Sequence, residues 1–173
     1  MTAEIIIGAE TPRDPSYIPL ATAKKNDIPN SRGMELIPQK QIIAKKAFAV
    51  AYPDAKPRSI TSTYNCVGMI FSSRRTRIDP KYLELIFTDD GYYRITDETQ
   101  LKEGDLVIYR NQSTHEITHI AKIYHVKFNL EDATRSFIVL SKWGDHGEYF
   151  HPIDILPPIL GKPSEFWSER RGL

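Results

Sequence analysis

The chain has 173 residues, enough to bury a core within one domain. Its 23 lysines and arginines nearly balance its 22 aspartates and glutamates, so the net charge of +1 gives no electrostatic attraction for nucleic acid or an anionic membrane. The single cysteine excludes an intramolecular disulfide. We expect one domain over residues 1–173, with no nucleic-acid or membrane partner and no cofactor.

The N-terminus lacks the features of a secretory signal. Its short apolar run, Ile5-Ile6-Ile7, has neither a basic region before it nor a long apolar segment after it. Nowhere does the sequence reach the ~18 apolar residues that a membrane-spanning helix needs. These features favour a cytoplasmic protein, and export without a signal peptide is the alternative.

Residues 8–40 form a proline-rich stretch that interrupts every long helix or central strand. Its prolines are Pro12, Pro15, Pro19, Pro29 and Pro38. We expect an extended arm laid over the domain, and an arm with few backbone bonds of its own is the segment best suited to block a groove. The following residues, 39–52, have apolar side chains at helical spacing and predict an amphipathic helix that ends before Pro53.

The only cysteine, Cys66, begins an apolar run that predicts a helix start. A helix N-terminus favours a thiolate, because unpaired backbone N–H groups and the positive end of the helix dipole lie beside the sulfur. The structural alternative is a small, buried, unreactive side chain.

The rest of the chain predicts one more helix and then a sheet. Asp79-Pro80 is typical of a helix start, and Asp89-Asp90-Gly91 of a helix end. Short runs of β-branched and aromatic residues then predict strands at 92–95, 106–110, 117–126, 137–140 and 148–151. Helices followed by a meandering sheet indicate an α+β fold.

Three motifs occur in a defined order. They are Asn65-Cys66-Val67-Gly68-Met69, Glu103-Gly104-Asp105-Leu106-Val107 and His119-Ile120-Ala121-Lys122-Ile123. Together they resemble the NlpC-type peptidases and amidases, compact relatives of papain with D-C-S-G, P-G-D-L and H-V-G-I-Y motifs. The resemblance covers residues 57–152, although Asn65 and Val67 replace the acidic residue and the serine of the family motif.

The resemblance implies a papain-like fold, with helices in the N-terminal half packed on an antiparallel sheet or half-barrel. It implies a cysteine hydrolase that cleaves a peptide or amide through an acyl-enzyme, with Cys66 as nucleophile and His119 as general base. A third polar group on the next strand would orient the imidazole. Ser141 or Lys142 is the expected residue, and His146 and His151 are further candidates.

The oxyanion of such a hydrolase would be stabilised mainly by the backbone N–H of Cys66, with the side chain of Asn65 or Tyr64 as an additional donor. A non-catalytic papain-like domain that binds or regulates a partner is an open alternative.

A competing motif points to zinc. Residues His115 to His119 match the H-E-x-x-H pattern of zinc peptidases, and His125 lies where the extended pattern has its third ligand. That chemistry requires a helix, whereas the segment is rich in strand-forming residues with period-two alternation. A zinc hydrolase with His115, His119 and His125 as ligands remains the alternative, and we expect no stoichiometric zinc.

Overall fold

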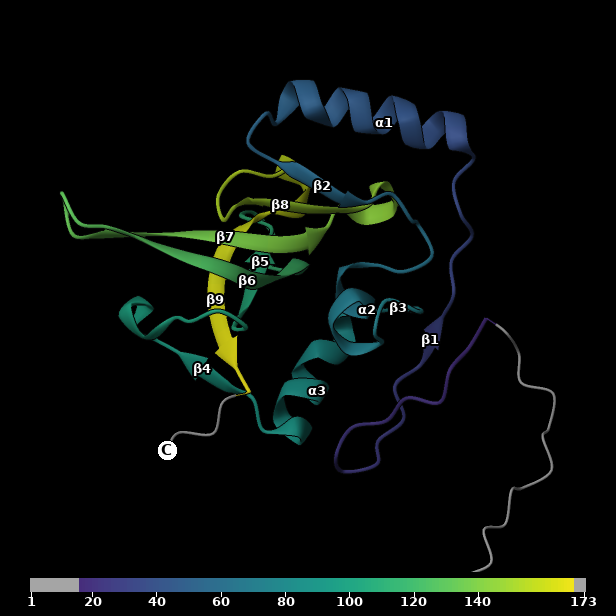
Figure 1. Ribbon diagram of the computed structural model, residues 1–173. Helices are drawn as coiled ribbons and strands as arrows, with labels where there is room; N and C mark the ends of the chain where they lie inside the picture. Colours follow the sequence, from purple (N-terminus) through teal and green to yellow (C-terminus); the bar gives the residue numbers. More distant parts are fainter. Residues whose placement is uncertain (1–15, 170–173) are drawn as a thin grey trace, which may run out of the picture.

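The computed structural model describes residues 16–169, and its centre is a seven-stranded antiparallel sheet with the order β2-β8-β7-β6-β5-β9-β4 (Figure 1). The strands are β2 (Lys56–Ser59), β4 (Tyr93–Ile95), β5 (Leu106–Arg110), β6 (Ile117–Asn129), β7 (Thr134–Lys142), β8 (Glu148–Pro152) and β9 (Lys162–Ser168). A separate pair is formed by β1 (Asn30–Ser31) and β3 (Arg77–Ile78). The α+β prediction is confirmed at this coarse level.

Three α-helices precede most of the sheet in sequence: α1 (Pro38–Ala51), α2 (Cys66–Phe71) and α3 (Leu83–Asp90). Short 3-10 helices are η1 (Pro80–Tyr82), η2 (Glu98–Gln100), η3 (Gly144–His146) and η4 (Pro158–Leu160). The predicted start at Asp79-Pro80 and the predicted end at Gly91 are both found. The Asp79 side chain accepts a hydrogen bond from the backbone of Lys81, and Gly91 ends α3 with a φ of 75°.

The two faces of the sheet bury different clusters, because successive side chains of a strand point to opposite faces. On one face, Ile108 of β5 and Ile120 of β6 pack with α2 and α3. On the other face, Tyr109 and Ala121 pack with aromatic side chains that include Trp143. We call these the α2 face and the α1 face.

Helix α1 contacts the sheet through few side chains and stands apart from the body (Figure 1). The Phe48 ring lies 5.3 Å from that of Trp143, and the Tyr52 ring lies 5.2 Å from it. No residue of α1 is buried. None of the helices in residues 16–169 is long and apolar enough to cross a membrane.

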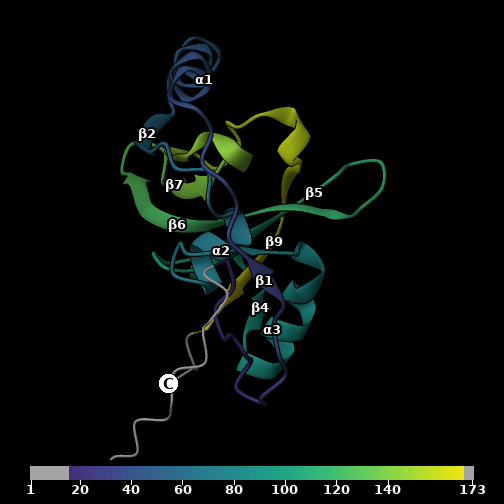
Figure 2. The same cartoon turned by 90° about the vertical axis from the view of Figure 1, so that its right-hand side faces the viewer.

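The proline-rich arm is extended where it is described, and we call residues 16–37 the strap. It ends at residue 37 rather than 40, because Pro38 is the first residue of α1. Residues 8–15 of the predicted arm lie outside the described part of the chain. From α1 the strap runs past α2 to β1 (Figure 2), and β1 pairs with β3.

Candidate functional site

Cys66 is the first residue of α2, as the sequence predicts. Asn65 caps this helix: its side-chain oxygen accepts a 2.9 Å hydrogen bond from the backbone of Gly68, and its amide donates to the Ile78 carbonyl at 2.7 Å. Gly68 allows close packing, since a Cβ there would lie 1.7 Å from the Thr76 carbonyl oxygen. Close packing against Thr76 therefore explains why position 68 is a glycine.

The Cys66 thiol is buried, with 7% of the residue exposed. Burial raises the pKa of the thiol, although the backbone N–H groups of Ile120 and Val67 lie beside the sulfur and favour the thiolate. The helix start is therefore as predicted, but the lowered thiol pKa that we expected of it is not found.

His119 lies on β6, one residue before Ile120, and its side chain belongs to the α1 face. It pairs with Tyr109 of β5, and the two rings are 5.3 Å apart. Ile120 and Cys66 instead share the cluster of the α2 face. The expected hydrogen bond between the thiol and the imidazole is absent because strand alternation turns the imidazole to the opposite face.

The His119 imidazole is buried without a polar partner. Neither ring nitrogen has a hydrogen bond to any residue within 16–169. Burial, together with the nearby His151 and Lys142, lowers the pKa of His119 to about 3, so the ring is neutral. Each unpaired buried polar group costs about 1–3 kcal/mol, and such a group requires an explanation.

Ser141 does not orient His119 as predicted. Its hydroxyl lies 2.8 Å from Nε2 of His151, while Nδ1 of that histidine lies 2.8 Å from the Pro152 carbonyl oxygen. Since Nδ1 donates to the carbonyl, Nε2 accepts from Ser141. The Trp143 indole donates to the Ser141 oxygen at 3.1 Å. Burial lowers the pKa of His151 to about 4, so a neutral, satisfied network stabilises the α1 face.

Lys142 does not contact His119 through a hydrogen bond either. It is buried, donates to the Gly144 carbonyl, and its ammonium lies 5.4 Å from the centre of the Tyr64 ring. Burial lowers the pKa of Lys142 to about 8. Its charge influences both Cys66 and His119, so it is the common electrostatic neighbour of the two predicted catalytic groups.

The two predicted oxyanion donors are both engaged elsewhere. Asn65 uses its side chain to cap α2, and the Tyr64 hydroxyl donates to Glu148 at 2.6 Å. Burial, then this bond, raises the pKa of Tyr64 to about 12. Neither side chain is free to bind a developing negative charge.

Glu148 of β8 is a buried carboxylate that sequence reasoning missed. Besides Tyr64 it binds Arg74 at 2.7 Å and Arg58 at 2.5 Å. Burial would raise the pKa of Glu148, but the hydrogen bonds from Tyr64 and Arg74 outweigh it and hold the pKa below its ordinary value. Tyr64 and Arg74 are 84 and 74 residues before Glu148 in the sequence. A local sequence pattern therefore cannot predict this cluster.

The three histidines of the zinc alternative do not lie together. His115 lies in the loop before β6, His119 is within the strand, and His125 is near the exposed end, where it binds Glu103 at 2.8 Å. His119 and His125 are six residues apart on one strand, which separates them by about 20 Å, too far for two ligands of one ion. Within residues 16–169 no three metal-binding side chains are grouped.

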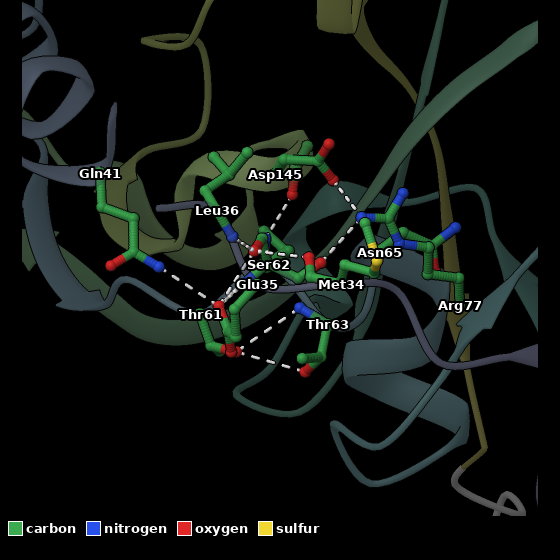
Figure 3. A network of polar contacts seen from close by, with 12 residues as sticks. Met34, Glu35, Leu36, Gln41, Thr61, Ser62, Thr63, Asn65, Arg77 and Asp145 are labelled. Carbon is green, nitrogen blue, oxygen red and sulfur yellow. Dashed lines mark hydrogen bonds and ion pairs between the residues drawn. The ribbon is translucent and has the colours of Figure 1, made fainter. Parts of the chain in front are cut away.

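The strap lies beside the segment that leads into α2 (Figure 3). Its Glu35 carboxylate accepts hydrogen bonds from the Thr61 hydroxyl and from the Ser62 backbone, the latter at 2.8 Å. Gly33 donates to the Thr63 carbonyl at 2.8 Å. Ile28 of the strap is buried in the same cluster as Cys66. The strap thus binds the residues that lead into α2 and shares a buried cluster with Cys66.

No protein-family model, curated protein or solved structure matches the chain.

Proposed function

We propose that the chain is a papain-like cysteine hydrolase in a closed conformation, with Cys66 as nucleophile. His119 does not serve as its general base, because its side chain lies on the opposite face of the sheet. The observation that supports a nucleophilic Cys66 is the surroundings of the sulfur: it lies at the start of α2, near the backbone N–H groups of Val67 and Ile120. Helix-terminal and backbone donors are the groups that stabilise a thiolate.

In the proposed reaction the Cys66 thiol loses its proton to solvent, its sulfur attacks the carbonyl carbon of an amide, and the leaving amine takes up a proton from solvent. A thioester remains on Cys66. Water then attacks the thioester, the carboxylic acid is released, and one proton of the water reaches the sulfur through solvent and restores the thiol.

Mass spectrometry of the intact protein tests this proposal. After exposure to an activated ester, p-nitrophenyl acetate, the wild-type chain should carry one acetyl group that is lost with time. The Cys66→Ser variant should lack the thioester, whereas His119→Ala should be acetylated at the wild-type rate. A wild-type chain that carries no acetyl group on Cys66 would overturn the proposal.

A second function, a non-catalytic binding domain, is favoured by a groove of about 610 Å³ on the α1 face. Its apolar lining includes Leu36, Phe48, Trp143, Pro157, Ile159 and Leu160. Grooves of this size with apolar and aromatic walls are typical of small-molecule sites. Ile159 is 83% exposed at the rim, so it can be changed without disturbing the core.

Binding of the apolar dye 1-anilinonaphthalene-8-sulfonate tests this second function. Ile159→Asp should reduce dye fluorescence, whereas Leu130→Asp, which alters a side chain that is 86% exposed at the tip of the β6–β7 hairpin, should not. Equal effects of the two variants would show that the groove is not the site.

A further inference from the structure

The strap is held by polar contacts near its two ends and by the short pairing of β1 with β3, and few of its side chains are buried. Near β1, Glu35 and Gly33 bind the segment 61–63. At its other end, the Thr22 hydroxyl donates to Asp89 at 2.7 Å, and the Ala23 backbone donates to Asp90 at 2.7 Å. Only two of its side chains, those of Thr22 and Ile28, are buried.

A segment with few buried side chains and exposed hydrogen bonds opens at lower free energy than the core. The core strands β5 and β6 have continuous buried stretches, whereas the strap is exposed along most of its length. The strap can therefore leave its seat while the sheet stays folded.

Arg77 joins the strap seat to the rest of the fold. Its guanidinium donates to the Ser62 carbonyl at 2.8 Å and to Asp145 at 2.5 Å (Figure 3). Gly33 packs against this group so closely that a Cβ on it would lie 2.3 Å from Arg77 Nε. Only glycine fits there while Arg77 keeps both bonds.

We infer that residues 16–37 act as a removable cover that controls access to Cys66. Seated, the strap places Ile28 in the Cys66 cluster and binds residues 61–63, directly before α2. Released, it uncovers the α2 start while the helix keeps its Asn65 cap and its packing on the sheet. This inference deepens the proposed hydrolase and rests on it for its purpose, but it concerns access to the thiol and not turnover.

The single cysteine makes the test direct, since every thiol reaction reports on Cys66. The full-length protein is treated with 4,4′-dithiodipyridine, and the rate of thiol reaction is followed by absorbance. Two variants loosen the seat in different ways: Glu35→Ala removes the carboxylate, and Gly33→Val drives the strap and the Arg77 guanidinium apart. Glu131→Ala, an exposed change in the β6–β7 hairpin, is the matched control.

We expect both strap variants to react about tenfold faster than wild type, which corresponds to ~1.4 kcal/mol lost from the seat. The control should react at the wild-type rate. The rates should depend only weakly on low urea concentrations, because local opening exposes little surface.

Two results would overturn the inference: wild-type rates in both strap variants, or rates whose urea dependence equals that of global unfolding. Hydrolysis is measured separately with p-nitrophenyl acetate. Faster labelling without any turnover supports the cover and contradicts the hydrolase, whereas turnover with unchanged labelling contradicts the cover alone.

Discussion

The Tyr64 hydroxyl donates a 2.6 Å hydrogen bond to the buried Glu148 carboxylate, and this contact fixes the segment before α2 to strand β8. Two arginines bind the same carboxylate, and each is about two-fifths exposed, Arg58 at 41% and Arg74 at 39%. The cluster thus joins three parts of the chain around one negative charge.

Glu148→Gln should lower the free energy of unfolding by about 2–3 kcal/mol. The change removes the charge on which the two arginines converge, and their partial exposure keeps the loss below that of a fully buried pair. Urea unfolding measures it. Tyr64→Phe removes one hydrogen bond and should cost about 1 kcal/mol. Equal losses for the two variants would show that the charge has no part in the stabilisation.

Acid should weaken the same cluster. Because the folded-state pKa of Glu148 is below its ordinary value, its contribution to stability is complete above about pH 4.3 and is lost as the pH falls through the folded-state pKa. The stability difference between wild type and Glu148→Gln should therefore shrink in acid. Urea midpoints at several pH values measure it, and a constant difference would contradict the assignment.

The Cys66 thiol of the seated wild type should titrate above the free-thiol pKa of about 8.5. Burial raises the pKa of this thiol, so its thiolate forms only in alkaline solution. The pH dependence of iodoacetamide labelling measures this. An inflection below the free-thiol pKa would mean that the backbone donors lower the pKa of Cys66 by more than burial raises it.

His119→Leu should stabilise the fold by about 1–3 kcal/mol, since it removes an imidazole whose nitrogens have no partner within residues 16–169. His151→Leu is the matched opposite and should destabilise the fold by a similar amount, because Ser141 loses its acceptor. Thermal unfolding of both variants decides it. Destabilisation by both would indicate that His119 has a polar partner in solution.

Purified protein without an affinity tag should contain no stoichiometric zinc, and a chelator should leave its unfolding curve unchanged. The spacing of His115, His119 and His125 along a loop and a strand cannot bring them to one ion. Elemental analysis measures the metal content. One zinc per chain that disappears in His115→Ala would contradict this.

Local patterns predicted most of the elements. The apolar run from Cys66, the Asp79-Pro80 start and the Gly91 stop gave α2, η1 and α3, and the strand from Leu106 to Arg110 has the predicted bounds. Strand β9 was missed because Lys162-Pro163 looks like a loop, yet its pairing with β5 overrides that signal. Its register is fixed by a partner strand more than fifty residues earlier in the chain.

The arrangement of the site was less predictable. Alternation correctly placed His119 and Ala121 on one strand face, but it does not say which face α2 covers. A shift of one residue in register moves a side chain from one face to the other. The Tyr64–Glu148 contact was also beyond prediction, because it forms only once β8 lies near the start of α2.

The two edges of the large sheet have a consequence for the concentrated protein. Edge β4 is three residues long, and edge β2 is four residues long with Pro57 inside it and an irregular register after it. A proline without an N–H and the flanking charges of Lys56 and Arg58 oppose the addition of a strand from another molecule. These features disfavour edge-to-edge aggregation into cross-β fibrils, although the β6–β7 hairpin exposes Phe128 and Leu130.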